Sequence, residues 1–479
     1  MSNAIRDYFT RRSPASGRVI LGVWLASYLS ASTPALALPQ DGQVTHGQGS
    51  IEATSASTME IRQASERMAA SFSSFDIAAQ EAVNVDQPGA SSVFLGNISG
   101  ESATTIFGTL TANGSVMLVN PRGVVFGKGS RVDTASLIAS SLGVDVDDFM
   151  SGALELEFSA DMAGRIVNRG VIQAAKGGSV TLMGDEVINE GLIVAEMGRV
   201  DLASGSEAVL TFDQDRLIGL KVTKSALGDL GGDTAVLNSG TIEADGGQIF
   251  LSADAARDLF SRAVQNEGIL RAKRAEEVNG EIVLSSTGDT WNSGRIEATA
   301  DSGTGGSVQV LGDRVAVSGE IDASGADGGG EILVGGDFQG KGDTQTAKKT
   351  YVGPDAELKA DATEEGDGGR VIVWADDATQ FFGSLSARGG EQGGDGGFAE
   401  VSGKGSLVFE GRESSPAEGH HSQLLLDPTD VYIFRGLRPV RRDRRGRRDL
   451  LRRRPRTRLP RTSTRPRSRG SSTVARTSA

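Results

Sequence analysis

Residues Ile188–Gly205 read INEGLIVAEMGRVDLASG, and this stretch contains both halves of a unit that recurs along the chain. The first half, INEGLIVA (Ile188–Ala195), is an Asn-x-Gly corner followed by alternating residues. The second half, GRVDLASG (Gly198–Gly205), is a glycine turn followed by a short alternation of apolar and polar residues. A period of two predicts strands and argues against helix. We therefore expect a two-strand unit with tight corners.

Both halves recur from about residue 165 onward. Further copies of the first half are VNRGVIQA (Val167–Ala174), LNSGTIEA (Leu237–Ala244), QNEGILRA (Gln265–Ala272), WNSGRIEA (Trp291–Ala298) and the weaker SGEIDA (Ser318–Ala323). Further copies of the second half are GGSVTLMG (Gly177–Gly184), GGQIFLSA (Gly246–Ala253), NGEIVLSS (Asn279–Ser286), GGSVQVLG (Gly305–Gly312), GGEILVGG (Gly329–Gly336), GGRVIVWA (Gly368–Ala375) and GGFAEVSG (Gly396–Gly403). Consecutive second halves, aligned from Val180 to Ala399, are spaced by 20, 49, 33, 26, 24, 39 and 28 residues. The shorter spacings match one coil of a parallel β-helix, and 49 residues fit two coils with an insertion.

Stacking explains why the unit repeats. One two-strand unit cannot bury its apolar row alone, whereas a stack of units buries the row and pairs each backbone amide with the coil above or below. The composition agrees, because 65 of 479 residues are Gly and only 5% are aromatic. Such a chain suits a thin core of small aliphatic residues. The predicted fold is an all-β solenoid.

The Asn and Gly at each corner have a structural interpretation. The chain must turn sharply there, and we expect positive φ angles, which these residue types tolerate. Stacked Asn side chains can also hydrogen-bond from coil to coil. The predicted structural ladder consists of Asn168, Asn189, Asn238, Asn266 and Asn292.

Several kinds of chemistry are excluded by composition. The chain has no Cys and three His, His46, His420 and His421, so thiolate chemistry is impossible and a His-based triad is disfavoured. The glycine-rich stretches 325–337 and 390–400 loosely resemble calcium-binding nonapeptide repeats. Those repeats need a strict nine-residue period, whereas the period here is near 25 residues and the Asp positions vary. We predict no catalytic, cofactor-binding or metal-binding residues.

The N-terminus has the pattern of a signal peptide. Four Arg residues precede an apolar run of 11 residues, Val19–Leu29, which is too short to span a bilayer. Ala35 and Ala37 form a small-x-small cleavage site, so we expect cleavage after Ala37 and export to the periplasm. The pair Arg11-Arg12 only weakly suggests the twin-arginine route.

The C-terminal 45 residues differ abruptly from the rest. Residues 435–479 contain 18 Arg, 2 Asp and no Lys, which gives +16; because the whole chain carries −13, the remainder carries −29. The tail could be a polybasic arm or disordered solvated charge. We favour a third interpretation, a frameshifted product of GC-rich DNA. The acidic remainder is unsuited to bind nucleic acid.

Residues 41–143, with several later pieces, resemble the N-terminal secretion domain of filamentous haemagglutinin-like exoproteins of the two-partner secretion pathway. The segments that carry the resemblance are GQVTHGQGSIE (Gly42–Glu52), SFDIAAQEAVNVDQP (Ser74–Pro88), the long run from Phe94 to Leu142, FDQDRLIGLKV (Phe212–Val222) and LLLDPTDVYI (Leu424–Ile433). The resemblance implies a right-handed parallel β-helix with short capping and extra-helical strands near its N-terminus. It also implies an outer-membrane barrel transporter with periplasmic docking domains as partner.

A turn motif of that family is matched by Asn120, Pro121, Arg122 and Gly123. The family usually has Asn-Pro-Asn-Gly, so Arg122 departs from the pattern, although a type I turn accepts it. A looser match to a second family segment runs from Asn97 to Gly100. Both segments could be recognised by the transporter, or they could only shape the turns, and the sequence leaves both interpretations open.

The resemblance also decides an ambiguous segment and the domain organisation. Met59–Phe72 has apolar spacing compatible with helix, but the resemblance predicts strand. We expect a signal peptide at 1–37, a secretion domain with the first coils at 38–300, continuing glycine-rich coils at 301–434 and a disordered basic tail at 435–479.

These features predict a secreted or cell-surface protein that is adhesin-like and not an enzyme. Host-cell or surface glycans are further candidate partners, and the mature chain has no predicted transmembrane segment. Two alternatives remain. Many parallel β-helices degrade polysaccharides, which requires clustered acids with Arg or Lys on one face; the acids here lie mainly at turns and outward positions. The other alternative is a surface scaffold without a specific receptor.

Overall fold

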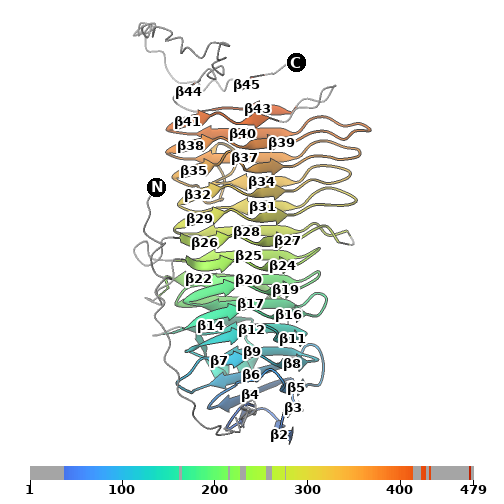
Figure 1. Cartoon of the computed structure of the whole chain (residues 1–479), viewed down its shortest axis with the longest axis vertical. Helices are drawn as coiled ribbons and strands as arrows, with labels where there is room; N and C mark the ends of the chain where they lie inside the picture. Colours follow the sequence, from blue (N-terminus) through green and yellow to red (C-terminus); the bar gives the residue numbers. More distant parts are fainter. Residues whose placement is uncertain are drawn as a thin grey trace, which may run out of the picture. The chain divides into compact units, whose positions relative to one another are not determined.

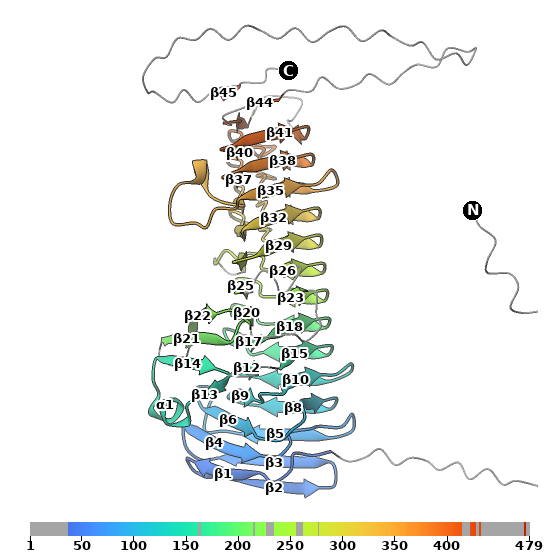
Figure 2. The same ribbon diagram turned by 90° about the vertical axis from the view of Figure 1, so that its left-hand side faces the viewer.

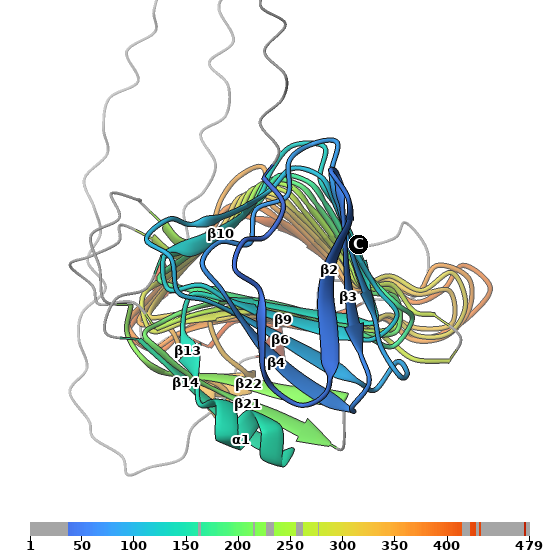
Figure 3. The same ribbon diagram turned by 90° about the horizontal axis from the view of Figure 1, so that it is seen from below.

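Three long sheets run along the chain, and from β5 onward each coil contributes one strand to each sheet in turn (Figure 1). The structure is a computed structural model that describes residues 37–160, 164–213, 216–226, 234–254, 262–275, 277–413, 422–427, 431–432 and 474–475. The predicted signal peptide up to residue 36 and most of the predicted basic tail lie outside these residues. Seen along the stack, the three sheets enclose a common interior (Figure 3).

Sheet 1 follows the second half of the sequence repeat. Its strands are β1 (Gln43–His46), β4 (Arg67–Phe72), β6 (Val93–Ile98), β9 (Ser115–Val119), β12 (Ser136–Ser140), β17 (Ser179–Gly184), β20 (Arg199–Ser204), β25 (Gln248–Ala253), β28 (Glu281–Ser286), β31 (Ser307–Val310), β34 (Glu331–Val334), β37 (Arg370–Ala375), β40 (Phe398–Gly403), β43 (Gln423–Leu425) and β45 (Val474–Ala475).

Five strands of sheet 2 end at the Asn of a corner. Its strands are β7 (Thr104–Ile106), β10 (Gly123–Phe126), β15 (Arg165–Asn168), β18 (Glu186–Asn189), β23 (Thr234–Asn238), β26 (Arg262–Asn266), β29 (Asp289–Asn292), β32 (Arg314–Val317), β35 (Lys349–Val352), β38 (Ala378–Phe381), β41 (Ser406–Phe409) and β44 (Val431–Tyr432).

Sheet 3 follows the corner. Its strands are β2 (Gly49–Ser55), β3 (Thr58–Gln63), β5 (Ala82–Asp86), β8 (Thr109–Ala112), β11 (Arg131–Thr134), β16 (Val171–Ala174), β19 (Leu192–Val194), β24 (Thr241–Glu243), β27 (Ile269–Arg271), β30 (Arg295–Glu297), β33 (Glu320–Asp322), β36 (Glu357–Lys359), β39 (Ser384–Ser386) and β42 (Arg412–Glu413). The expected all-β solenoid is confirmed, and Met59–Phe72 forms parts of β3 and β4 as strands. The expectation of two strands per unit is wrong, because a third strand, in sheet 2, precedes each corner.

The core is built from columns of equivalent residues. Val180, Val200, Ile249 and Ile282 are successive register partners in sheet 1, and their side chains are fully buried. The column continues through Val308, Ile332, Val371 and Ala399. Burying one Val or Ile side chain contributes about 1.5–3 kcal/mol. Because each residue packs on the coil below, this stabilisation accumulates coil by coil.

Antiparallel strands close the first coil. β1 pairs antiparallel with β4, and β2 pairs antiparallel with β3, whereas the following pairs in these sheets, such as β4 with β6 and β3 with β5, are parallel. A cap of this kind covers the exposed edge of the first coil, which would otherwise be free to pair with another chain.

An extra-helical layer covers the outer face of sheet 1 near its N-terminal end (Figure 2). It consists of α1 (Val146–Ser151) and an antiparallel sheet of β13 (Gly143–Val144), β14 (Glu155–Ser159), β21 (Glu207–Asp213) and β22 (Arg216–Lys224). Asp145 caps α1, because its Oδ1 accepts hydrogen bonds from the backbone N–H groups of Asp147 and Asp148 at 2.8 and 3.0 Å. A second, shorter insertion follows β34 and contains the 3₁₀ turn η1 (Phe338–Gly340).

Candidate functional site

The Asn120–Gly123 turn connects β9 of sheet 1 to β10 of sheet 2 in the N-terminal coils. The backbone N–H of Gly123 donates to Asn120 O at 2.8 Å, which closes the turn. Gly123 has φ +101°, and a Cβ there would lie 2.2 Å from Arg165 O in the next coil. A glycine is therefore required by both backbone conformation and close approach.

Asn120 holds this turn from inside. Its side chain is fully buried, and its Nδ2 donates to Ser102 O and to Thr104 Oγ1, both at 3.0 Å. Its Oδ1 accepts from the backbone N–H of Arg122 at 2.9 Å. Asn120 thus joins two coils and cannot present its side chain to a partner in the folded state. Pro121 and Arg122 are exposed, so theirs are the side chains that the folded turn presents to solvent.

The second predicted segment lies one coil earlier at the same corner. Asn97 is half-buried in β6, where it pairs with Ser71 of β4 and Val119 of β9. Gly100 follows the strand, and a Cβ there would lie 2.0 Å from Ser73 O. The structure therefore places both segments on neighbouring coils, and the hydrogen bonds of the Asn120 Nδ2 go to Ser102 and Thr104, just beyond the segment 97–100.

The five corner Asn residues form a continuous side-chain chain in the interior. Each Nδ2 donates to the Oδ1 of the next Asn: Asn168 to Asn189 at 2.8 Å, Asn189 to Asn238 at 2.7 Å, Asn238 to Asn266 at 2.8 Å and Asn266 to Asn292 at 2.8 Å. All five side chains are fully buried. Buried amides are costly unless they are hydrogen-bonded, so the repeated pairing accounts for Asn at this position.

The glycines beside the Asn ladder serve a different purpose from the one expected. Gly191, Gly240, Gly268 and Gly294 do not have positive φ, and neither do the ladder Asn residues. A Cβ on Gly240 would lie 2.1 Å from Gly191 O, and one on Gly268 would lie 2.0 Å from Gly240 O. The expectation of positive φ is wrong because the chain turns without it. Glycine is needed there because consecutive coils approach too closely for a side chain.

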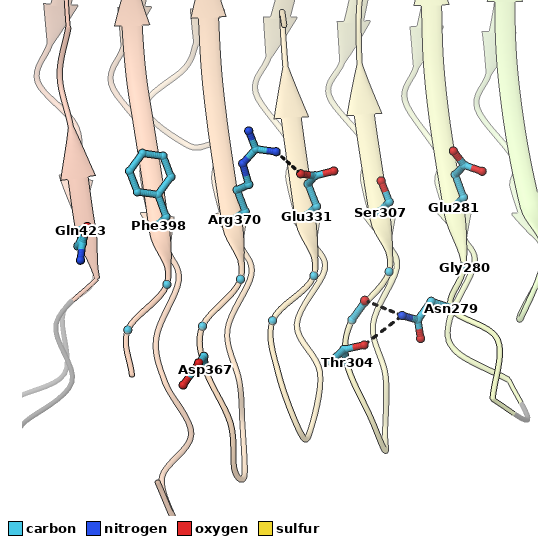
Figure 4. Close-up of a pocket in the computed structure, with 18 residues that line it drawn as sticks. Asn279, Gly280, Glu281, Thr304, Ser307, Glu331, Asp367, Arg370, Phe398 and Gln423 are labelled. Atoms are coloured by element: carbon cyan, nitrogen blue, oxygen red, sulfur yellow. Dashed lines mark hydrogen bonds and ion pairs between the residues drawn. The ribbon is translucent and has the colours of Figure 1, made fainter. Parts of the chain in front are cut away.

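A groove follows the glycine turns between sheet 3 and sheet 1 (Figure 4). Its volume is about 860 Å³, and four glycine pairs line it: Gly305-Gly306, Gly329-Gly330, Gly368-Gly369 and Gly396-Gly397. A neighbouring groove of about 1020 Å³ shares Asn279 and Glu281 with it and continues along the preceding coils. A row of strand side chains, visible in Figure 4 from Glu281 to Gln423, forms one wall.

The carboxylates of this groove are engaged in structural contacts. Glu331 Oε1 lies 2.5 Å from Arg370 Nη1, and Glu281 Oε2 accepts from Gln248 Nε2 at 2.7 Å. Asp367 Oδ1 accepts from the backbone N–H of Asp395 at 2.7 Å. Glycoside hydrolysis generally uses two carboxyl groups that face each other across the scissile bond. Glu281, Glu331 and Asp367 instead face neighbouring coils.

The predicted signal-peptide cleavage site lies at the N-terminal limit of the described residues. Ala35 lies outside the described residues. Ala37 is the first described residue, and its backbone N–H donates to Glu81 Oε1 at 2.7 Å.

The sequence interpretation missed which residues would hold the extra-helical layer. Leu95, Met117, Ile138 and Met183 point outward from sheet 1 yet are nearly fully buried, because they pack against Phe149 and the rest of that layer. The signal was present, since β6, β9 and β12 contain consecutive apolar residues where one-sided burial predicts alternation.

Comparisons with known proteins agree with this architecture. A family model described as "TPS secretion domain" matches residues 35–298. Two heme/hemopexin-binding proteins from Haemophilus influenzae are 32% and 31% identical over 276 and 277 residues, which cover 56% and 53% of this chain. The matched region spans 29% of each of those relatives, under a third of their length. The crystal structure of the HMW1 secretion domain from Haemophilus influenzae superposes with a TM-score of 0.69 and 28% identity, covering 81% of this chain and all of that one.

Proposed function

The chain belongs to the TPS secretion domain family, and on this premise we propose that it leaves the cell through a dedicated outer-membrane barrel with periplasmic docking domains and then serves as an adhesin-like surface protein. TPS exoproteins reach the cell surface or the medium by way of the periplasm, and this is the localisation of the chain. Within the described residues, no helix has the length and apolarity needed to cross a bilayer.

The observation that carries the proposal is the nearest-neighbour construction of the stack. Each core column and each step of the Asn ladder joins one coil only to the coils beside it. A structure of this kind can form from one end and propagate. Coils that fold outside the outer membrane would prevent the chain from sliding back, so folding itself would bias transport outward without nucleotide hydrolysis.

Recognition by the barrel is assigned to the corner that contains Asn120–Gly123. Pro121 and Arg122 are the exposed side chains of that turn, while Asn120 fixes its shape. Arg122 stands where the family usually has Asn. We therefore propose that the transporter of this chain recognises both the shape of the turn and the exposed side chains of Pro121 and Arg122. The neighbouring segment Asn97–Gly100 would contribute to the same surface.

We further propose that residues 38–300 act as the secretion domain and that residues 301–434 extend the coil stack. The matched relatives have names that describe heme and hemopexin binding, and the matched solved structure is a secretion domain. An adhesin-like binding role is therefore favoured over catalysis. The engaged carboxylates of the glycine-lined groove support the same choice.

Secretion in the presence and absence of the barrel tests the proposal. The full chain would be expressed in a Gram-negative host with the barrel, without it, and with a barrel that lacks its docking domains. We expect release into the medium only with the intact barrel. Equal release in all three strains would overturn the proposed export route.

A further inference from the structure

Two aromatic side chains, Trp291 and Tyr351, lie on the outer face of sheet 2, on the strands to either side of β32. Trp291 of β29, Ala316 of β32 and Tyr351 of β35 are successive register partners. Neighbouring residues in these strands point inward, as the buried Thr290, Asn292 and Val317 show, so the three register partners point outward. The outer surface therefore has a low point at Ala316 between two rings. The three strands lie one above another in Figure 2.

Each ring is supported from behind. The guanidinium of Arg262, on β26, covers one face of Trp291 at 4.2 Å from the ring centroid. β26 and β32 lie on opposite sides of β29, and the indole Nε1 reaches the residue after β32, where it donates to Ser318 Oγ at 3.5 Å. Phe382 contacts Tyr351 on the side away from β32, with ring centroids 5.8 Å apart. The two rings are the walls of a slot over Ala316, and Arg262 and Phe382 contact these walls from the strands outside it.

The slot has the dimensions of a single six-membered ring. Residues around it, including Thr290, Arg314 and Gln380, line a cavity of about 320 Å³. Neighbouring strands lie about 4.8 Å apart, so the strands that carry Trp291 and Tyr351 are separated by roughly 9.6 Å. Ring contacts prefer centroid separations of about 4.5–7 Å, so one ring fits between the walls and contacts both. Tyr351 is 40% exposed, which places it among the few exposed large hydrophobic side chains of the described residues.

Cationic groups lie at one end of the slot. Arg314 and Lys349 precede Ala316 and Tyr351 by two residues on the same strands, so they share the outer face. Both side chains are exposed, and Arg314 is held by a bidentate contact with Asp289. The charges of Arg314, Lys349 and Asp289 sum to +1, whereas the coils as a whole are acidic. An anionic group on a bound ring would find its complement here.

We propose that this slot, the Trp291–Tyr351 slot, binds a hexuronic acid unit of an acidic glycan, with the pyranose ring between the two aromatic side chains and its carboxylate toward Lys349 and Arg314. A pyranose has C–H-rich faces that pack on aromatic rings and hydroxyl groups at its edges that require polar partners, and Gln380 offers such a partner at the rim. A nucleobase has comparable faces, so the oligonucleotide is a competing ligand that the titrations below compare directly with the glycan. The inference deepens the proposed adhesin-like role and rests on it, because the slot must face the outside medium.

Intrinsic fluorescence gives a direct readout. Besides Trp291, the chain has Trp24 in the predicted signal peptide and Trp374, which is buried under the insertion after β34. The exported chain would be titrated with hexagalacturonate, with cellohexaose as the neutral counterpart, and with a single-stranded oligonucleotide. We expect hexagalacturonate to change the Trp291 emission, with the same change in a Trp374→Phe variant, and cellohexaose to bind more weakly.

Variants test the walls and the rim separately. Tyr351→Ala should weaken hexagalacturonate binding by about tenfold or more, whereas Tyr351→Phe, which keeps the ring, should bind within about twofold of the parent. Lys349→Ala should weaken binding and abolish the preference over cellohexaose. Circular dichroism would establish that each variant is folded. The proposal would be overturned if Tyr351→Ala bound hexagalacturonate as tightly as the parent, or if hexagalacturonate caused no change in fluorescence. It would also be overturned if cellohexaose bound as tightly as hexagalacturonate, or if the oligonucleotide bound more tightly. The same titrations can be done on protein refolded from cells. Glycan binding can therefore be measured even if the chain proves not to be exported through the barrel.

Discussion

The side-chain amide of Asn189 donates to Asn238 Oδ1 at 2.7 Å, although the two residues are 49 positions apart in the chain. The same step between Asn168 and Asn189 spans 21 residues and has a length of 2.8 Å. The ladder therefore keeps its geometry while the intervening chain length more than doubles. The corner is a fixed feature of the coil, and the insertions leave it undisturbed.

Removing one rung should destabilise the stack. Asn238→Ala would leave the Nδ2 of Asn189 and the Oδ1 of Asn266 without their amide partner in the ladder, because Asn238 accepts from Asn189 and donates to Asn266. The expected loss is about 1–3 kcal/mol in the free energy of unfolding, measured by urea denaturation. The control is Asn279→Ala, an exposed Asn outside the ladder whose hydrogen bonds to Arg274, Thr304 and Gly305 lie at the surface, so a smaller loss, below about 1 kcal/mol, is expected. Equal effects at both positions would contradict a structural ladder.

Adding a methyl group at a ladder glycine should be more disruptive. A Cβ at Gly240 would lie 2.1 Å from Gly191 O, a backbone atom that cannot move without separating two coils. We expect Gly240→Ala to lower the free energy of unfolding by several kcal/mol, on the order of the largest single-residue effects. Gly89→Ala is the matched control, since a Cβ there meets nothing within 4 Å and its φ is not positive. Thermal unfolding monitored by circular dichroism would compare them, and a tolerated Gly240→Ala would refute the close-approach explanation.

Variants of the Asn120–Gly123 turn can test its structural role and its proposed role in transporter recognition separately. Asn120→Ala removes three hydrogen bonds made by a fully buried side chain, so both the stability of the N-terminal coils and export should decrease. Arg122→Ala alters an exposed side chain, so its free energy of unfolding should remain within about 0.5 kcal/mol of the parent. If the barrel reads the exposed pair, the amount of Arg122→Ala in the medium should still fall severalfold.

The matched control for this turn is Arg122→Asn, which introduces the residue usual in the family. Export of this variant should be closer to that of the parent than export of Arg122→Ala is. Quantitative immunoblots of medium and periplasm would measure the distribution. Normal export of Arg122→Ala would show that the side chain has no part in recognition and that the turn contributes only its shape.

Glu400 should make stability depend on pH. Its side chain is fully buried on the outer face of sheet 1, where Oε2 accepts from the backbone N–H of Gln339 at 3.0 Å. Burial raises the pKa of the Glu400 carboxyl, and nearby Asp427 raises the pKa further, while Gln339, Ser402 and Arg370 partly oppose this. The folded state therefore holds the proton to a higher pH than the unfolded chain, whose pKa is near 4.5.

The raised pKa of Glu400 in the folded state makes the protein less stable as the pH rises. The stabilising contribution of the protonated carboxyl is fully present below pH 4.5 and is lost as the pH rises through the folded-state pKa. Glu400→Gln keeps an acceptor for Gln339 but carries no charge, so it should unfold with a free energy higher than the parent by about 1–3 kcal/mol at pH 8 and little different at pH 4. Glu365→Gln, at an exposed position, should show no such pH-dependent gain. Urea titrations at the two pH values would decide, and a Glu400→Gln variant less stable than the parent at pH 8 would contradict the assignment.

Local sequence patterns determined the strands, the corners and the solenoid class. Period-two alternation decides which residues of a strand point inward, so the column from Val180 to Val371 could be aligned from the sequence before its pairing was known. The repeated Asn at each corner likewise indicated which residues could stack. Both signals are local, because they depend on neighbours within about ten residues.

Register between coils was decided only by the tertiary structure. Corresponding residues of successive coils are separated by variable insertions, and strand pairing, not chain distance, brings them into line. For this reason the sequence could not show that Trp291, Ala316 and Tyr351 share one column, that Gly240 lies against Gly191 O, or that an extra-helical layer covers the apolar outer face of sheet 1. The alternation fixes a side chain's direction within its own strand, whereas its neighbours above and below depend on hydrogen bonds to strands that lie tens of residues away.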